Sequence, residues 1–281
     1  MYVTVNNTRI YVDIEGAGLV PDGASMRQRP TLVLLHGGPG FDHSLFKPVF
    51  SELTDIAQIV YMDHRGNGRS SHDAPSTWNL AQWGDDVRGV CDALGIVKPI
   101  VYGVSFGGFV AQSYATRHPE HPGKLVLAST AARADWPAVF DAFERIAGPE
   151  ARDLARDYWL TPTPERRIAY REKCHPLYHT RPQRDAQATA RAIVHDPVNL
   201  HFATDEFRRM DFRAALARVA CPTLVMAGDS DPITPLAFSE TIVAHLPTAL
   251  TRFERFTDCG HGIVNDAPQR HFAVLRDFML S

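Results

Sequence analysis

Short, wholly apolar runs alternate with helix-like stretches along this chain, and that rhythm limits the folds that it can adopt. Runs of this kind fit strands that are buried on both faces, as in a parallel sheet. The predicted strands are residues 31–35, 58–62, 100–102, 125–128, 223–227 and 250–256. Helix patterns lie at residues 44–53, 80–94, 107–118, 238–246 and 268–280. The alternation predicts an α/β fold in which helices flank a mostly parallel, twisted sheet.

The rhythm breaks once, over residues 132–217, which have helical composition and no run typical of a buried strand. We interpret this stretch as a helical insertion between two strands of the sheet. The predicted core is then residues 1–131 and 218–281, and the insertion is a cap. Because the insertion interrupts the sheet near the carboxyl ends of its strands, we expect it to cover a pocket there.

The first 29 residues precede this rhythm. Residues 2–5 and 9–14 are predicted to form a hairpin with Asn-Asn at its turn, and residues 15–29 a surface loop. The opening has no basic segment followed by an apolar core, so no signal peptide is expected. No apolar run approaches the roughly 20 residues of a membrane helix. We expect a soluble, cytoplasmic protein.

Charge and cysteine patterns exclude several classes of partner. The formal net charge is −3, and pairs such as Arg166-Arg167 and Arg208-Arg209 are short and interleaved with acids, which indicates a solvated helix surface. We therefore expect neither a nucleic-acid nor a membrane partner. The four cysteines lack metal-site or redox spacing, so we expect reduced thiols and no metal. No dinucleotide- or phosphate-binding glycine motif is present, so no cofactor is expected.

The candidate nucleophile is Ser105. The sequence Gly-Val-Ser-Phe-Gly-Gly at residues 103–108 directly follows a predicted strand and opens a predicted helix. A serine on such a tight strand-to-helix turn is held in strained backbone and presented at the edge of the sheet. The helix that follows directs its N–H groups and the positive end of its dipole at a developing oxyanion. The alternative is a tight turn that contains a serine by chance.

A serine hydroxyl needs a base, and His261 is the candidate. It lies in Asp-Cys-Gly-His-Gly at residues 258–262, between the last strand and the last helix, although a surface-loop histidine is the alternative. Asp231 is the candidate acid that orients His261, because it follows the carboxyl end of a strand. Asp229 is its competitor, and either aspartate could instead cap the next helix. The order Ser, Asp, His is typical of this kind of fold.

Oxyanion donors are predicted from a second glycine-rich motif, His-Gly-Gly-Pro-Gly at residues 36–40, which follows the strand 31–35. We assign the two donors to the main-chain N–H groups of Gly38 and Phe106. Gly37 is predicted to lie in the substrate-binding site. His36 comes directly off a buried strand, so we expect it to make a structural hydrogen bond rather than to act as a base.

The motif at residues 36–40, together with Asp-His-Arg-Gly-Asn-Gly-Arg-Ser at residues 63–70, resembles the proline iminopeptidase (prolyl aminopeptidase) family of the α/β hydrolases. The second motif has His64 where that family usually has glutamine, and we interpret it as structural. The resemblance covers about residues 31–128 and 221–280. It implies the α/β-hydrolase fold with a cap, and release of an N-terminal proline or small apolar residue from a short peptide.

The resemblance also implies an acid that binds the free ammonium of the peptide. The stretch Thr-Asp-Glu-Phe at residues 204–207 is similar to an Asn-Glu-Phe-like segment of some members, so Glu206 is the implied amine-binding residue, with a surface-helix glutamate as the alternative. Two features of those members are missing. Pro232 stands where they have a glutamate, and the cap lacks their Trp-x-x-Trp-Glu segment.

Three functions therefore remain open. The first is an aminopeptidase that works through an acyl-enzyme. The second is a carboxylesterase, lactonase or amidase acting on a small neutral substrate with the same machinery and no ammonium pocket. The third is a ligand-binding, non-enzymatic protein on the same fold. The sequence gives no indication of the oligomeric state.

Overall fold

The computed structural model describes residues 1–185 and 187–281. Within them, the main sheet has eight strands in the order β1-β2-β6-β5-β7-β8-β9-β10. Pairs β1–β2 and β2–β6 are antiparallel, and the other neighbouring pairs are parallel. The strands are β1 (Tyr2–Val5), β2 (Thr8–Glu15), β5 (Thr31–Leu35), β6 (Gln58–Met62), β7 (Ile100–Val104), β8 (Lys124–Ala128), β9 (Thr223–Gly228) and β10 (Thr251–Phe256). The predicted, mostly parallel α/β sheet is confirmed.

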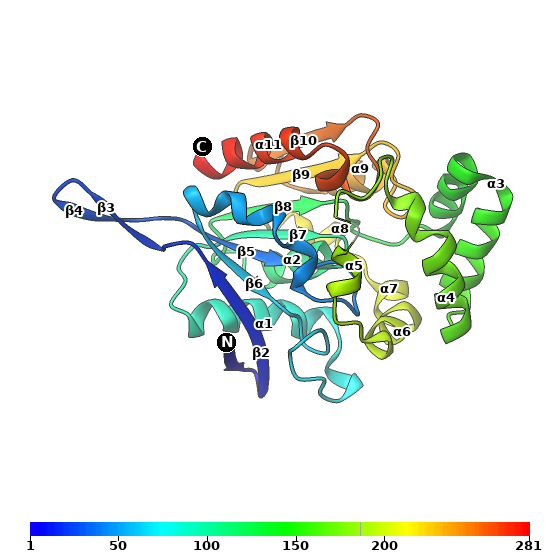
Figure 1. Cartoon of the computed structure of the whole chain (residues 1–281), viewed down its shortest axis with the longest axis horizontal. Helices are drawn as coiled ribbons and strands as arrows, with labels where there is room; N and C mark the ends of the chain where they lie inside the picture. The colour runs from blue at the N-terminus through cyan, green and yellow to red at the C-terminus, as the bar shows by residue number, and fades with distance from the viewer. Residues whose placement is uncertain (186) are drawn as a thin grey trace.

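Helices cover both faces of this sheet (Figure 1). Alternate residues of β5 show why, since Val33 and Leu35 belong to one buried cluster and Leu32 and Leu34 to the other. The first cluster includes side chains of α1 (Leu80–Ala93), α2 (Phe106–Arg117), α8 (Arg213–Leu216) and α9 (Leu236–His245). The second includes side chains of η1 (His43–Phe46), η2 (Val49–Asp55), α10 (Ile263–Asp266) and α11 (Pro268–Leu280). Two short turns, η3 (Pro75–Thr77) and η5 (Thr248–Leu250), contribute no buried residue to either cluster.

Two predicted elements are wrong. The helix expected at residues 44–53 is the pair of 3₁₀ turns η1 and η2, because Pro48 lies between them and has no N–H to continue a helical ladder. The loop expected at residues 15–29 contains a second, two-stranded antiparallel sheet, β3 (Leu19–Asp22) and β4 (Ser25–Gln28), which projects from the body of the molecule (Figure 1). Most of its side chains are exposed, so no alternation of apolar and polar residues marked it in the sequence.

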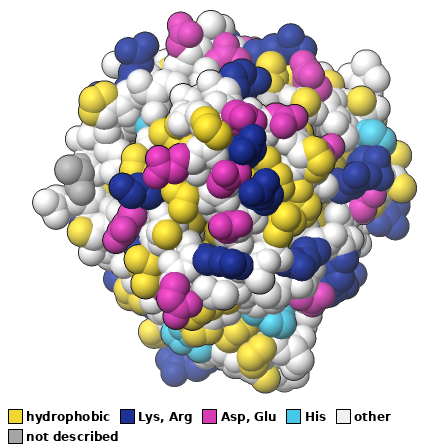
Figure 2. All heavy atoms as spheres, turned by 90° about the vertical axis from the view of Figure 1, so that its right-hand side faces the viewer, with side chains coloured by type: hydrophobic (Ala, Val, Ile, Leu, Met, Phe, Trp, Pro, Cys, Tyr) yellow, Lys and Arg dark blue, Asp and Glu magenta, His cyan; other side chains and the backbone are white. Residues whose placement is uncertain are grey.

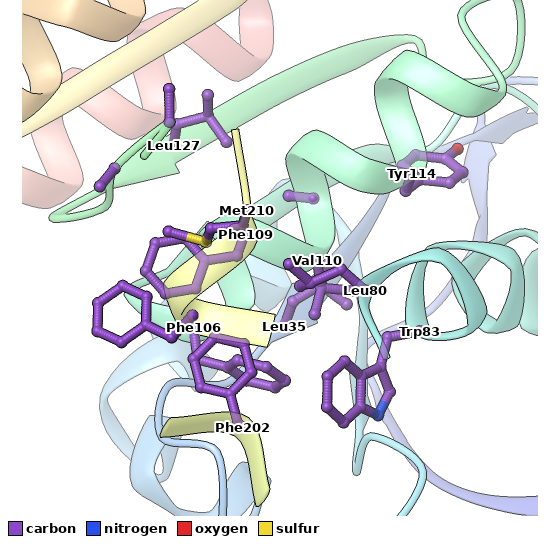
Figure 3. Packing of buried hydrophobic residues seen from close by; sticks show 14 of the residues in the cluster. Leu35, Leu80, Trp83, Phe106, Phe109, Val110, Tyr114, Leu127, Phe202 and Met210 are labelled. Atoms are coloured by element: carbon purple, nitrogen blue, oxygen red, sulfur yellow. The ribbon is translucent and has the colours of Figure 1, made fainter. Parts of the chain in front are cut away.

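The interval between β8 and β9 is helical. It contains α3 (Trp136–Leu160), α4 (Pro164–Lys173), η4 (His175–Tyr178), α5 (Ala188–Arg191), α6 (Asp196–Thr204) and α7 (Glu206–Arg209). Phe202 of α6 packs against Phe106 and Phe109 of α2, with ring centroids 5.1 and 5.9 Å apart (Figure 3). The insertion therefore rests on the helix that follows Ser105. The domain boundaries at residues 132 and 217 stay a prediction.

The face of the molecule on the α3–α4 side carries Lys and Arg side chains interspersed with Asp and Glu (Figure 2). Among the described residues, no helix combines the length and apolar character needed to cross a membrane. The four cysteines are buried free thiols, as expected.

The loop after β6 is tied to the core by a buried ion pair. Arg65 donates from Nε and Nη2 to the two carboxylate oxygens of Asp86 on α1, each at 2.8 Å. The same carboxylate accepts the side-chain amide of Asn6 from the β1–β2 turn, at 2.9 Å. The side chains of Arg65 and Asp86 are 3% and 1% exposed. One ion pair thus joins the 63–70 loop, the hairpin and α1.

Replacing Arg65 by methionine should lower the free energy of unfolding by about 3 kcal/mol or more, because it leaves the Asp86 carboxylate buried without its cation. Urea unfolding followed by circular dichroism measures this. The control is Arg88→Met, which removes the exposed partner of Asp92 on the same helix and should cost less than about 1 kcal/mol. Equal losses in the two variants would contradict the structural role of the Arg65–Asp86 pair.

Candidate active site

Ser105 lies on the tight turn between β7 and α2, with φ 54° and ψ −119°, a backbone conformation that costs energy for any residue with a side chain. Two glycines make this turn possible. A Cβ atom on Gly107 would overlap the carbonyl oxygen of Leu35, and one on Gly103 would overlap the carbonyl oxygen of Gly107. The turn therefore packs directly on β5 and presents Ser105 at the carboxyl end of the sheet.

Strand β5 is the point where the strand order reverses, since β6 lies on one side of it and β7 on the other. At such a reversal, the loops that follow the two adjacent strands, here β5 and β7, meet at one crevice. Leu35 pairs with Gly103, and a Cβ atom on Gly37 would lie 3.4 Å from the Cβ of Ser105. Neither the Gly38 nor the Phe106 N–H donates to an acceptor among the described residues. Phe106 directly follows Ser105, and Gly38 follows the glycine that lies against it, so their role as oxyanion donors stays a prediction.

His261 and Asp231 come together at the ends of the neighbouring strands β10 and β9. The Nδ1 atom of His261 lies 2.7 Å from Oδ2 of Asp231. Asp231 also accepts hydrogen bonds from the N–H groups of Ile233 (2.9 Å) and Thr234 (2.8 Å) and from the Thr234 hydroxyl (2.6 Å). The carboxylate is buried, and these donors fix it in one orientation toward the imidazole.

Ser105, His261, Gly37 and Gly38 all line one cavity of about 360 Å³. Among the described residues, no direct hydrogen bond joins the Ser105 hydroxyl to His261. The shared cavity places both side chains where one substrate carbonyl can contact them. A hydroxyl, an imidazole held by a carboxylate and two unpaired N–H groups are the parts required for nucleophilic acyl transfer.

Asp229, the competing acid, has a different role. Its Oδ1 accepts the N–H of Asp258 at 3.0 Å and the hydroxyl of Ser230 at 3.0 Å. It therefore holds the start of the loop that carries His261 and does not contact the imidazole itself. Sequence alone left the two aspartates as alternatives because both follow β9 within three residues.

His36 makes the structural hydrogen bonds that its position predicts. Its Nδ1 lies 2.8 Å from the carbonyl oxygen of Gly37, and its Nε2 accepts the N–H of His64 at 3.3 Å. Burial lowers the pKa of His36, so the ring is neutral and can donate from one nitrogen and accept at the other. It thereby connects the 36–40 loop to the 63–70 loop.

Glu206, the residue implied to bind an amine, lies elsewhere. One of its carboxylate oxygens accepts the N–H of Leu80 at the start of α1 at 2.7 Å, and the other pairs with Arg209. Its side chain is only 6% exposed, and it borders a separate surface cavity with Trp78 and Asn79 instead of the cavity of Ser105. The carboxylate is already used to stabilise a helix N-terminus and an ion pair, so the structure does not bring it to the site.

Asp42, His43 and Asp63 place three ligand-type atoms close together. Asp63 accepts the N–H groups of His43 and Arg69, and Asp42 pairs with the Arg69 guanidinium. Because protein donors already occupy these oxygens, we assign the cluster a structural role rather than a metal site.

The walls of the cavity were not foreseen from the sequence. Six aromatic side chains from the insertion line it: Tyr158, Trp159, Tyr170, Tyr178, Phe202 and Phe207. The ring of Tyr178 packs edge-on against His261, with centroids 5.0 Å apart. Arg167 also lines the cavity and is buried, so the prediction that the Arg166-Arg167 pair lies on a solvated surface is wrong for Arg167. Its helix has one polar and one buried face, and composition alone does not reveal which arginine points inward.

Replacing Asp231 by asparagine should slow labelling of Ser105 by a fluorophosphonate by about 10³- to 10⁴-fold, because an amide favours the wrong imidazole tautomer and does not stabilise the imidazolium. The measurement is the second-order labelling rate, with Ser105→Ala as the unlabelled blank. Asp229→Asn is the matched control and should label within a few-fold of the native rate. Similar losses in both variants would contradict the assignment of Asp231.

Comparisons with known proteins agree with this geometry. The family model described as "alpha/beta hydrolase fold" matches residues 30–268. A putative carbamate hydrolase RutD of Caulobacter vibrioides is 29% identical over 255 residues, covering 88% of this chain and 90% of that protein. Proline iminopeptidase PfmaB of Pestalotiopsis fici is 30% identical over 257 residues, covering 85% and 88%. The solved esterase EaEST of Exiguobacterium antarcticum superposes with a TM-score of 0.77 at 20% identity, over 100% of this chain and 99% of that one. The chain therefore belongs to the alpha/beta hydrolase fold family and is a hydrolase.

Proposed function

We propose that the protein is a serine esterase that cleaves small carboxylic esters with apolar or aromatic groups through an acyl-enzyme. The observation that carries this proposal is that Ser105 and the Asp231–His261 pair open into one cavity with aromatic walls. Pockets for small molecules are typically apolar, with a few polar groups that fix the orientation of the ligand.

Each group has a defined part in the proposed reaction. The Ser105 oxygen attacks the ester carbonyl carbon while Nε2 of His261 takes the hydroxyl proton. The carbonyl oxygen gains negative charge, which the N–H groups of Gly38 and Phe106 stabilise. The C–O bond to the leaving alcohol then breaks, and His261 returns the proton to that oxygen. Water, deprotonated by His261, hydrolyses the acyl-enzyme and restores Ser105.

Asp231 supports both halves of this cycle without touching the substrate. The imidazole becomes positively charged each time it takes a proton, and the carboxylate 2.7 Å away stabilises that charge. Thr234 supports the carboxylate in turn through its N–H and its hydroxyl.

An aminopeptidase is the second candidate, because of the 36–40 motif and the 30% identity to PfmaB. That activity requires carboxylates facing the ammonium of the substrate. Among the described residues, Asp185 is the acid in the lining of the cavity, and it pairs with Arg191. The lining also contains the cations Lys47, Arg167 and Arg184. Because the acid in the described lining is already paired with an arginine, the lining favours the esterase.

Turnover of three chromogenic substrates tests the choice: 4-nitrophenyl butyrate, prolyl 4-nitroanilide and its N-acetylated form. We expect the butyrate to be hydrolysed, and Ser105→Ala to lower that rate by about 10⁴-fold or more. N-acetylation should change anilide hydrolysis only a few-fold, since no unpaired carboxylate lines the cavity among the described residues. Efficient cleavage of the free prolyl anilide that acetylation abolishes would support the aminopeptidase instead.

A further inference from the structure

The cap side of the cavity carries a buried cation that the proposed ester chemistry does not use. Arg167 lies on α4, lines the same cavity as Ser105 and His261, and has a side chain only 4% exposed. We propose that Arg167 binds a carboxylate of the substrate, so that the substrates of this enzyme are esters whose acyl part carries a second, free carboxylate. The proposal rests on the proposed esterase function and narrows its substrate class.

The hydrogen bonds of Arg167 do not use all the donors of its guanidinium. Nε donates to Asp196 at 2.5 Å, and Nη1 has a long contact of 3.4 Å with the hydroxyl of Tyr158. The buried Nη2 atom has no partner within the described residues. A guanidinium has five N–H donors, and its Nη1–Nη2 edge matches the two oxygens of a carboxylate. A buried donor of this kind is satisfied by water or by a ligand, and the place of Arg167 in the lining of the cavity favours a ligand.

The charges around Arg167 favour an anion over a cation. His175 also lines the cavity, and burial, with Arg167 and Arg171 nearby, lowers its pKa to about 3. Its ring is therefore neutral at ordinary pH and does not compete for an anion. The ammonium of Lys47 is already paired with Asp13 and Glu15. Asp196 neutralises Arg167 only from the Nε side and is itself 45% exposed.

Hydrogen bonds also connect Arg167 to the 36–40 loop, which carries the proposed oxyanion donor Gly38. Tyr158, which accepts from Arg167, donates to Asn199 at 2.5 Å, and Asn199 donates to the carbonyl oxygen of Pro39 at 3.0 Å. A carboxylate held by Arg167 on the cap wall would thus be fixed relative to a carbonyl held by Gly38 on the sheet wall. The substrate must bridge the two walls, so a spacer between its carboxylate and its scissile carbonyl is required.

Matched ester pairs that differ only by a terminal carboxylate test this proposal. Mono-4-nitrophenyl adipate is compared with 4-nitrophenyl hexanoate, and the suberate monoester with 4-nitrophenyl octanoate. For at least one pair, the native enzyme should have a higher kcat/KM for the carboxylated ester. Arg167→Met should lower the ratio of the two kcat/KM values by about 10- to 100-fold, mainly through KM of the carboxylated ester. Free adipate should also inhibit the native enzyme competitively and inhibit this variant much less.

Two further variants separate loss of the guanidinium from loss of charge or of stability. Arg167→Lys retains the charge but not the planar pair of donors, so the ratio should fall by an intermediate amount even if the methionine variant is unstable. Arg166→Met removes the same charge from the neighbouring position, whose side chain binds the carbonyl oxygen of Thr161, and should leave the ratio unchanged. Thermal unfolding of each variant confirms that it is folded.

The outcomes separate this inference from the proposed function. If neutral and carboxylated esters are cleaved equally well, or if folded Arg167 variants keep the native ratio, the carboxylate site is wrong and the esterase stands. If no ester is cleaved by the native enzyme, the proposed function fails. In that case, protection of the native protein against thermal unfolding by adipate, lost in Arg167→Met, would still support the anion site.

Discussion

The site depends first on how closely helix α2 approaches strand β5. Gly107 sits against the Leu35 carbonyl so tightly that a single added carbon would overlap it. This contact forces the turn before α2 into its strained conformation and fixes the direction of the Ser105 side chain. It also brings the 36–40 loop beside the same serine. The buried rings of Phe106 and Trp83, 4.9 Å apart, hold the helix in place behind the turn.

The opposite side of the cleft is built from hydrogen bonds instead of tight packing. Asp231 accepts hydrogen bonds from two backbone N–H groups and a hydroxyl in addition to its contact with His261. Asp229 accepts a backbone N–H of the loop that carries His261. Charged groups keep a defined position away from water only when several donors or acceptors hold them. Asp231 thus orients the imidazole, and Asp229 orients the loop that carries it.

The helical insertion between β8 and β9 forms much of the wall of the cavity that contains Ser105 and His261. It contributes aromatic walls, one buried arginine and a hydrogen-bonded link from Tyr158 through Asn199 to the 36–40 loop. Because the same fold supports many reactions, selectivity resides in such inserted elements more than in the sheet. Two relatives of similar identity to this chain are named as a putative carbamate hydrolase and a proline iminopeptidase.

The sequence by itself determined the sheet, the strand-to-helix turn at Ser105 and the positions of Gly38, Phe106 and His261 beyond strand ends. These are local properties, set by the periodicity of apolar residues and by glycines at tight turns. Only the tertiary structure decided that Asp231, and not Asp229, contacts His261. It also placed Glu206 outside the cavity and Arg167 in its lining. These three outcomes depend on which segments, distant in the chain, supply the hydrogen-bond partner. The residues that a side chain contacts across a cleft come from other segments, so the local sequence pattern around it does not identify them.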